Sequence, residues 1–354
     1  MTDDPRLEQV LQQEERWDME GDPRWAGYVK AFVAVVLLLF AGGIATNMVV
    51  NPRGEFPHQW LPPVPSEDAA YKTYLLDRQP PPEVLVLGSS RMQKIDPQDI
   101  QRSGNLTAFN FAVAGTQPAD SLRVYRGLVQ RGYHPKEILV GLDINRIEPH
   151  EDEHRTQAAF GPLHEDAAGL RDQVMAGLRT FTFQYLRDSA TSLYFALEGP
   201  RPIGITFDED GLAHFRAWEE AEANGSFDLD KSLAAAIGAG GYLPYGGLDP
   251  VQVTALQELT ARALANGTTV RMVITPIHAR LEQSYGVSGY PQARQAVVDL
   301  ARSLCQPGVH AFNYTRVAGF GGLEGGFFDG VHYNAANAAR LVEGVYSGRG
   351  DLCA

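Results

Sequence analysis

An uncharged apolar segment near the start of the chain constrains the architecture of this protein more than any other feature. Residues 31–50 read AFVAVVLLLFAGGIATNMVV, in which only Thr46 and Asn47 carry polar side chains. Twenty residues at the rise of an α-helix cross the roughly 30 Å hydrocarbon core of a bilayer. A buried helix of a water-soluble domain normally has a polar face, which this segment lacks. The segment therefore predicts a transmembrane helix.

The flanks of this segment indicate an anchor that stays attached. A cleaved signal peptide has a short charged region and an apolar stretch of roughly 7–15 residues. Here a strongly charged region of thirty residues precedes a longer apolar run, which favours an uncleaved anchor. A slight excess of basic residues on the N-terminal side predicts that residues 1–30 form a cytoplasmic tail. The C-terminal part of the chain would then lie outside the cytoplasm.

The charge balance argues against one class of partner. The 354 residues include 43 acidic and 30 basic side chains, which gives a net charge of −13, and no block is rich in Lys or Arg. Nucleic-acid binding needs a basic footprint that displaces counterions from phosphates. We therefore expect no nucleic-acid partner.

Two cysteines, Cys305 and Cys353, both fall on the proposed outer side. They either pair in a disulfide that holds the C-terminal tail to the body, or remain two unrelated buried thiols. Their number and spacing match no metal-binding finger.

The rest of the chain divides into a linker and one large domain. Residues 51–66 contain five prolines and predict an extended linker. Within residues 67–354, short apolar runs bounded by turn residues alternate with helical patterns, which predicts a parallel sheet covered by helices on both faces. The expected strands are residues 83–87, 108–113, 138–142, 270–275 and 309–313, and the expected helices are residues 67–78, 121–131, 250–266 and 334–346.

Residues 151–245 interrupt this alternation. Residues 170–197 have a helical pattern, and residues 203–207 and 212–215 flank Asp-Glu-Asp-Gly, which predicts a hairpin turn. We expect an insertion that forms a cap or wall beside the sheet.

Chemically capable side chains follow several of the expected strands. Ligands of open α/β sheets bind at the carboxyl ends of the strands. Ser90 follows the first strand, Gly115 the second, and Asp143 and Asn145 the third. Asp329 and His332 follow the last strand within FDGVHYN, three residues apart at an expected helix start, where a single turn can bring them together. A serine hydroxyl needs an adjacent base, and an imidazole serves when a carboxylate holds its other nitrogen. These residues predict Ser90 as nucleophile, His332 as base and Asp329 as its orienting partner.

The order of these blocks resembles the SGNH hydrolases, also called the GDSL-type family. The nucleophile block is Gly88-Ser89-Ser90-Arg91, the glycine block contains Gly115, the third block is Gly141-Leu142-Asp143, and the last is Asp329-Gly330-Val331-His332. The N-terminal helix followed by NPRG and GSSR is similar to exported proteins of bacterial envelope polysaccharide O-acetylation.

This resemblance implies a three-layer α/β/α, flavodoxin-like (SGNH-type) domain behind one transmembrane helix, in the inner membrane of a bacterium. It implies a serine esterase or O-acyltransferase that acts on an extracytoplasmic polysaccharide, or on a small acyl ester, through an acyl-serine and without a cofactor. Proteins of envelope biosynthesis are the protein partners that it suggests.

Two positions depart from the family pattern. Ser89 stands where aspartate is usual, and Asp143 stands where asparagine is expected, with Asn145 two residues later. An ionised carboxylate cannot donate a hydrogen bond to an oxyanion. Either Asn145 substitutes, or the oxyanion is held by the N–H groups of Ser90 and Gly115. The alternative function is a catalytically weak SGNH-like module that binds or assembles envelope polysaccharide.

Three further candidates complete the sequence-based site. Arg91 follows the nucleophile and is suited to a negative group of the substrate, or to a salt bridge at the rim of the sheet. His278 follows a strand and lines the mouth of the site, or caps a helix. Residues 150–154, HEDEH, fit a zinc-protease pattern, but the acidic residues between the histidines favour a solvated loop, so we expect no metal.

Overall fold

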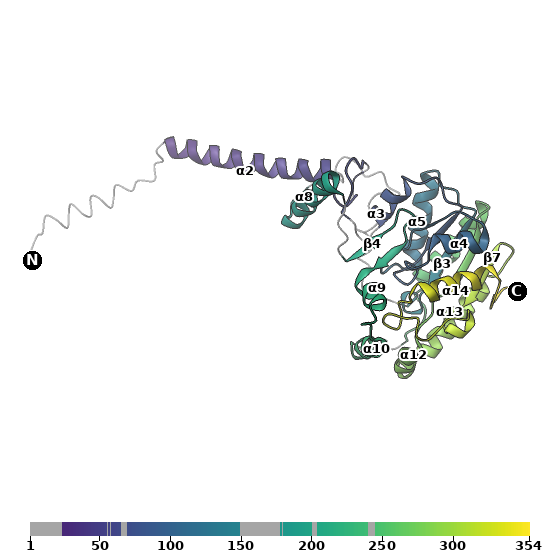
Figure 1. The fold of residues 1–354 in the computed structure, drawn as a ribbon. Helices are drawn as coiled ribbons and strands as arrows, with labels where there is room; N and C mark the ends of the chain where they lie inside the picture. The colour runs from purple at the N-terminus through teal and green to yellow at the C-terminus, as the bar shows by residue number, and fades with distance from the viewer. Residues whose placement is uncertain are drawn as a thin grey trace, which may run out of the picture.

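The computed structural model describes residues 23–54, 56, 58–64, 69–148, 178, 180–199, 204–239 and 245–354. A long helix, α2 (Pro23–Val50), projects from an α/β domain that holds the other described elements (Figure 1). An 18-residue stretch within residues 25–50 of α2 reaches a mean hydropathy of 2.3, and the helix is long and apolar enough to cross a membrane. The structure thus agrees with the expected helix and extends it toward the N-terminus.

The domain is built on a parallel sheet of five strands, as the alternating pattern predicts. The strand order is β2-β1-β3-β6-β7, so the chain leaves β1 on one side to form β2 and returns to its other side to form β3. Every pairing in this sheet is parallel. The strands are β1 (Val84–Leu87), β2 (Ala108–Asn110), β3 (Glu137–Leu142), β6 (Thr269–Ile274) and β7 (Val309–Asn313).

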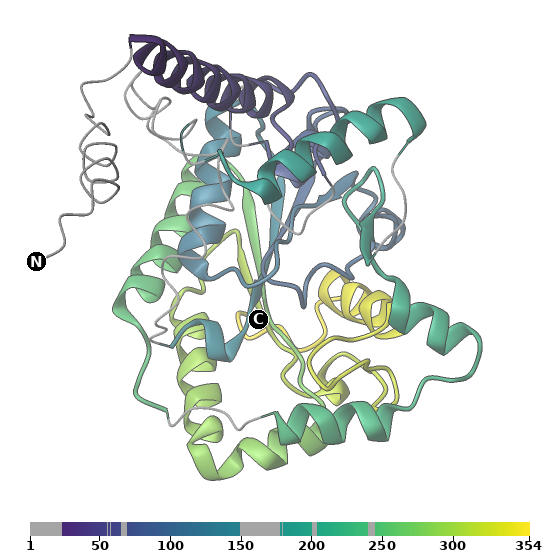
Figure 2. The ribbon, with the colours of Figure 1, turned by 90° about the vertical axis from the view of Figure 1, so that its left-hand side faces the viewer.

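Helices cover both faces of this sheet because successive strand residues point to opposite sides. Leu85 and Leu87 of β1 pack into one core, whereas Val84 and Val86 pack into the other. The two helix layers lie on either side of the sheet in Figure 2. The first core is covered by α3 (Ala69–Leu76), α5 (Pro118–Gln130), α11 (Pro250–Ala265), α12 (Ala279–Tyr285) and α13 (Tyr290–Ser303), and the second by α4 (Pro97–Gly104) and α14 (Ala335–Tyr346). Single 3-10 turns are η1 (Ile144–Arg146), η3 (Gly286–Ser288) and η4 (Val317–Gly319).

The described part of the predicted insertion contains three helices and a hairpin. The hairpin strands β4 and β5 pair antiparallel, as expected, and the turn between them binds the outer edge of β2 through a hydrogen bond from the Asn110 N–H to the Asp210 carbonyl. The fully buried Lys72 ammonium donates to the carbonyls of Asn110 in β2 and Gly211 in the hairpin turn, and so connects the hairpin to the sheet. The elements are α8 (Phe183–Glu198), β4 (Ile205–Phe207), β5 (Ala213–Phe215), α9 (Arg216–Ala223) and α10 (Leu229–Gly238).

The segment after α2 differs from the extended linker that its prolines predict. The Asn51 side chain donates to the Phe56 carbonyl and accepts from the Phe56 N–H, and the Val64 N–H donates to the Pro52 carbonyl. Asn51 has a φ of 49°, a left-handed conformation that asparagine tolerates well. One asparagine thus folds the proline-rich stretch into a compact loop, which a count of prolines does not indicate.

The C-terminal tail is fastened to the other edge of the sheet. Cys305 and Cys353 form a disulfide, which resolves the alternative left open by the sequence. Asp351 pairs with Phe312 in an isolated antiparallel bridge, and the Leu352 N–H donates to the Ala311 carbonyl at 2.7 Å. The tail therefore covers the outer edge of β7.

Candidate active site

A tight turn after β1 presents Ser90. Gly88 begins this turn with a φ of 136°, and the N–H groups of Met92 and Gln93 donate back to the carbonyls of Ser89 and Ser90. A Cβ atom on Gly88 would lie 2.8 Å from the Met92 Cγ and 3.2 Å from the Cα of Gly141 in β3. Only glycine allows both this backbone conformation and this close packing. The first residue of the block thus fixes where the serine emerges.

Asp329 and His332 lie in a compact loop before α14. We expected the start of a helix to bring them together, but α14 begins only at Ala335. Instead the Phe328 N–H donates to the His332 carbonyl at 2.7 Å, and Phe327 pairs with Tyr333 in an antiparallel bridge. Gly330 has a φ of 95° at the tip, so the loop turns back sharply.

The structure brings Ser90, His332 and Asp329 into one chain of hydrogen bonds. The Ser90 Oγ lies 2.8 Å from the His332 Nε2, and the His332 Nδ1 lies 2.7 Å from the Asp329 Oδ2. The other carboxylate oxygen, Oδ1, accepts from the N–H groups of Val331 and His332. An imidazole held in this way on Nδ1 leaves Nε2 to accept the proton of the serine hydroxyl.

The Asp329 carboxylate is held in its ionised form. Burial opposes ionisation, but the hydrogen bonds and charge of His332, with the two backbone N–H groups, outweigh it and hold the pKa of Asp329 below its usual value. An ionised carboxylate accepts the Nδ1–H and fixes the tautomer of His332. The electrostatics therefore suit a general base at Nε2.

Two backbone N–H groups after the carboxyl ends of β1 and β2 make no hydrogen bond with the described residues. Within the described residues, neither the Ser90 N–H nor the Gly115 N–H donates a hydrogen bond. Gly115 has a φ of 77°, and the nearest side-chain atom to a Cβ built on it is the Arg146 Nη2 at 3.9 Å. Both groups thus remain candidates for the oxyanion donors that the sequence suggests.

The two positions that depart from the family pattern contact each other. The Ser89 hydroxyl donates to the buried Asp143 carboxylate, which also accepts from the Thr275 Oγ1 at 2.6 Å. The Arg91 Nε lies 3.6 Å from the same carboxylate. Asp143 is therefore engaged beneath the turn that carries Ser90, as an acceptor and an ion-pair partner.

Arg91 also orients Asn145. Its Nη2 donates to the Asn145 Oδ1 at 3.1 Å, and its Nη1 donates to the Thr275 Oγ1 at 3.3 Å. With its oxygen turned toward Arg91, Asn145 has an amide NH2 group that donates to no described residue. Arg91 thus contacts Asp143, Thr275 and Asn145, and the Asn145 amide NH2 group remains a donor without a partner among the described residues.

His278 caps α12 and supports the loop of Asp329 from behind. Its ring Nδ1 accepts from the Arg280 backbone N–H at 3.1 Å, and the His278 backbone N–H donates to the Gly330 carbonyl at 2.8 Å. Its Nε2 lies 3.5 Å from the Glu324 carboxylate, and its ring meets Phe327 edge-on. Burial lowers the pKa of His278. The structure records no hydrogen bond from this ring to the three residues of the hydrogen-bonded chain, so the capping alternative describes its position.

An aromatic wall that the sequence did not reveal surrounds His332. The ring centroids of Phe215 and Trp218 lie 5.7 Å and 5.6 Å from the His332 ring, and Trp218 stacks on Phe328 at 5.3 Å. Phe215 is buried, whereas Trp218 is half-buried. These aromatics come from the end of β5 and from α9, so the insertion does form a wall, as expected. Only long-range packing places them there, and no local pattern marks them.

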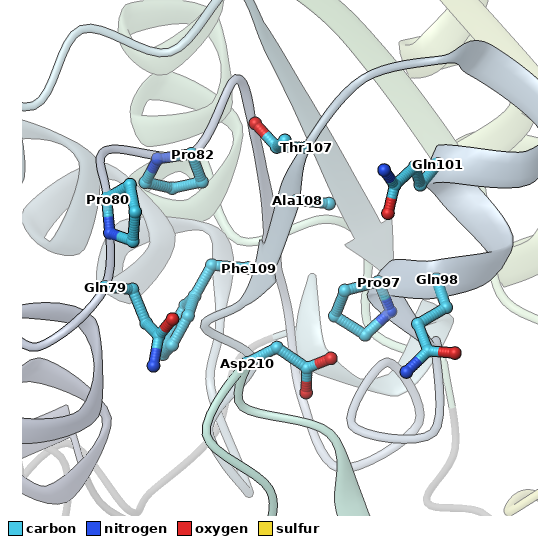
Figure 3. Close-up of a pocket in the computed structure, with 10 residues that line it drawn as sticks. All are labelled: Gln79, Pro80, Pro82, Pro97, Gln98, Gln101, Thr107, Ala108, Phe109 and Asp210. Atoms are coloured by element: carbon cyan, nitrogen blue, oxygen red, sulfur yellow. The ribbon is translucent and has the colours of Figure 1, made fainter.

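Two cavities lie away from Ser90. One, of about 350 Å³, lies behind Phe328 and is lined by charged groups that include Lys94, His214 and Glu219. The other, of about 330 Å³, lies near the amino ends of β1 and β2, between Pro80, Pro97 and Asp210 (Figure 3). Ser90 follows the carboxyl end of β1, so the second cavity lies at the opposite end of the strand.

In the part of the chain that the structure describes, no group of three His, Cys, Asp or Glu side chains is arranged to hold a metal ion. The HEDEH sequence of residues 150–154 lies outside the described residues.

Comparison with known proteins gives no assignment. No family model matches this chain, and a search of curated proteins finds no match. The chemistry of the site is therefore inferred from its geometry.

Proposed function

We propose that this protein is a membrane-anchored serine esterase or O-acyltransferase that forms an acyl-serine at Ser90. The observation that carries this proposal is the continuous hydrogen-bonded chain from the Ser90 Oγ through His332 to Asp329. Residues 90 and 332 are separated by 242 positions in the sequence, so their contact requires the whole sheet to be assembled. A nucleophile, a base and an orienting carboxylate in this order are the parts of acyl-transfer chemistry.

The reaction proceeds in two balanced halves. In the first, the Ser90 Oγ attacks the carbonyl carbon of an acyl ester while its proton passes to the His332 Nε2. His332 then protonates the leaving alcohol oxygen as the ester bond breaks, which leaves the acyl group on Ser90. In the second, His332 takes the proton of water or of a sugar hydroxyl as that oxygen attacks the acyl carbon, and His332 then returns the proton to the Ser90 Oγ as the bond between Ser90 and the acyl group breaks. Asp329 stabilises the imidazolium in both halves.

The negative charge on the tetrahedral oxygen needs donors. The N–H groups of Ser90 and Gly115 and the amide of Asn145 are the donors that we assign to it. Removing one such donor slows acyl transfer by a factor of roughly 10²–10³ in enzymes that use an oxyanion hole. Asp143 takes no part in this assignment because it already accepts hydrogen bonds from Ser89 and Thr275.

We propose further that the domain has the flavodoxin-like, SGNH-type fold. Counted without the hairpin strands, the order of the sheet is 2-1-3-4-5, which is the flavodoxin-like order. In such folds the ligand binds where the strand order reverses, outside the carboxyl ends of the two strands concerned. Ser90 follows β1, and Asp143 and Asn145 follow β3, which pairs with β1.

The proposed substrate is an acyl ester of an extracytoplasmic polysaccharide at a bacterial inner membrane. The apolar helix α2 supports the membrane location, and the family resemblance supports the envelope glycan. The half-buried Trp218 beside His332 supports a sugar-bearing substrate, because an indole ring offers a flat apolar surface with a polar edge.

Reaction with a fluorophosphonate tests the proposal, because this probe phosphonylates only an activated serine. The full chain in detergent is compared with Ser90→Ala and His332→Ala, and Ser303→Ala serves as the matched control because Ser303 is exposed on α13. We expect the adduct on the peptide that contains Ser90, its loss in the first two variants and its retention in the third. Absence of the adduct from the unaltered protein, or its survival in Ser90→Ala, contradicts the proposal and favours the binding module.

A further inference from the structure

Helix α8 carries an apolar stripe on its exposed side. Positions 183, 186, 190, 193 and 197 repeat with spacings of three and four and therefore lie along one side of the helix. Phe183 and Leu197 are 86% and 84% exposed, and Leu186 and Leu193 are also exposed. A second strip, which contains the exposed Arg187 and the half-buried Thr191, is polar. An apolar stripe beside a polar one is typical of a helix that lies at the boundary between an apolar phase and water.

The inward side of the same helix buries two serines and one aromatic residue and none of its leucines, unlike the aliphatic inner side of a helix in a water-soluble domain. The buried residues there are Tyr185, Ser189 and Ser192. The Ser189 hydroxyl donates to the Asn47 Oδ1 at 2.7 Å, and the Ser192 hydroxyl donates to the Pro62 carbonyl at 2.7 Å. Polar contacts therefore attach α8 to the protein, while its leucines face outward. Such a helix is expected only where its outer surroundings are themselves apolar.

Helix α8 is attached at the end of the helix that is suited to cross a membrane. The ring centroids of Phe181 and Phe40 lie 4.1 Å apart, and the Asn47 Nδ2 donates to the Thr180 carbonyl at 2.9 Å. A Cβ atom on Gly43 would lie 2.9 Å from the Phe181 ring, so a glycine in α2 permits this close approach. The exposed side chains of α2, among them Leu38 at 71%, continue the apolar surface of α8.

Further contacts hold α8 beside the domain end of α2 (Figure 1). Arg53, just after α2, forms an ion pair with Asp188 at 2.7 Å and lies over the Tyr185 ring at 4.9 Å. These contacts fix α8 relative to α2, and so relative to any bilayer that α2 spans.

We propose that α8 is a membrane-contact helix whose stripe of Phe183, Leu186, Ala190, Leu193 and Leu197 lies in the headgroup boundary of the same bilayer. The occupant of the stripe is the lipid surface, because α8 is fixed beside α2, whose own exposed side chains are apolar. The domain is then held at a fixed height and tilt by two elements rather than by one flexible tether. This inference requires α2 to span the membrane and is independent of the chemistry at Ser90.

Single spin labels on the full chain in vesicles of phosphatidylethanolamine and phosphatidylglycerol test the proposal. The two native cysteines are paired in the disulfide, so an added cysteine is the one thiol to react. Labels on Phe183→Cys, Leu193→Cys and Leu197→Cys are compared with one on Thr191→Cys, which lies on the polar strip. We expect collisions with oxygen, which dissolves in lipid, to exceed those with a water-soluble nickel chelate several-fold at the three stripe positions and to fall below them at Thr191.

Two reference labels make each outcome decisive. Leu38→Cys reports the hydrocarbon around α2, and Ala265→Cys reports water at an exposed site of α11. Stripe labels that behave like the Ala265 label, while the Leu38 label remains in lipid, overturn the contact of α8 with the membrane. Stripe labels that are shielded from both reagents, together with cross-linking between molecules of the unlabelled cysteine variants, overturn it in favour of a second copy of the chain. A water-exposed label at position 38 shows that α2 does not span the membrane and so overturns the proposal. This outcome does not depend on the result with the fluorophosphonate. An unchanged thermal unfolding midpoint shows that each variant has kept its fold.

Discussion

At the scale of single residues, Ser89 and Asp143 show how side chains beneath the turn of Ser90 hold one another in place. The Ser89 hydroxyl donates to the Asp143 carboxylate, and Arg91 lies beside the same carboxylate and turns Asn145. The sequence identified both departures. It could not show that Asp143 points beneath the turn, because that depends on Thr275, which follows β6 more than a hundred residues later in the chain.

Substitutions at Asp143 and Asn145 separate structure from catalysis. Asp143→Ala leaves the largely buried Arg91 guanidinium without its carboxylate, which we expect to lower the free energy of unfolding by about 3–5 kcal/mol. Asn145→Ala removes one oxyanion donor, which we expect to slow acylation by roughly 10²–10³ while the unfolding free energy changes little. Urea unfolding and the rate of fluorophosphonate labelling measure the two effects. A destabilised Asn145→Ala variant that labels at the full rate refutes this division of roles.

Asp329→Asn tests the orienting role of the carboxylate. An amide at this position can hold His332 in the tautomer that carries its proton on Nε2, so the imidazole no longer accepts from the Ser90 hydroxyl. We expect the rate of fluorophosphonate labelling to fall about 10⁴-fold, as in other triads. The comparison variant is Glu324→Gln, because Glu324 approaches only the capping His278. A loss of less than tenfold in Asp329→Asn would show that His332 is oriented by other groups.

At the scale of elements, the strands were predictable and their surroundings were not. Buried parallel strands are short apolar runs, so the sequence located all five. Strand β2 is shorter than expected and ends at Asn110. The Asn110 side chain donates to the carbonyls of Met92 and Ile95 and so holds the turn after β1 against the end of this strand. The placement of the hairpin and α9 against His332 depends on contacts between distant segments. The sequence predicted a helix start at Asp329 and His332, where the structure has a loop. This loop depends on the bridge between Phe327 and Tyr333, which no local sequence pattern indicates.

The hairpin and α9 are joined by a histidine between two carboxylates, which predicts a pH dependence. His214 contacts Asp208 and Glu219 at 3.0 Å each; burial opposes its protonation, but these carboxylates outweigh burial and raise the pKa of His214. A raised pKa adds stability that is fully present below the ordinary value of about 6.5 and is lost as the pH rises through the folded value. Free aspartate, glutamate and lysine side chains ordinarily titrate outside this window.

We therefore expect amide exchange in residues 205–219, corrected for its intrinsic rate, to accelerate between pH 6 and pH 9. His214→Gln should show fast exchange at both values. His310→Gln is the matched control, because His310 pairs with Asp351 at the far edge of the sheet and should leave this segment unchanged. Exchange in the unaltered protein that does not respond to pH would exclude His214 as the titrating link.

At the scale of the whole molecule, the sheet is closed at both edges by segments of its own chain. The hairpin turn covers β2 through the Asn110 N–H, and the tail covers β7 through Asp351 and Leu352. Unpaired strand edges are templates for pairing with other chains, so covered edges protect a domain from aggregation. The disulfide of Cys305 and Cys353 holds the second cover in place.

Opening this disulfide should weaken the whole domain. Its sequence separation of 48 corresponds to about 4 kcal/mol of stability in the chain-entropy model. We expect Cys305→Ser with Cys353→Ser to lower the free energy of unfolding in urea by about this amount and to increase light scattering at high concentration. A reducing agent should reproduce the loss in the unaltered protein and have no effect on the double variant. Equal stabilities with and without the disulfide would show that the tail is held by other contacts alone.

The cover on β7 also sets a schedule for biogenesis. Residues 351–353 are made after every strand and after α14, so during synthesis the sheet has one uncovered edge until these residues arrive. A nascent chain with such an edge is open to wrong pairing with its neighbours. If the domain is exported, it crosses the membrane before its tail is oxidised, and disulfide formation becomes the last step of maturation. The timing of oxidation, rather than the speed of sheet formation, would then limit how much protein reaches its mature form.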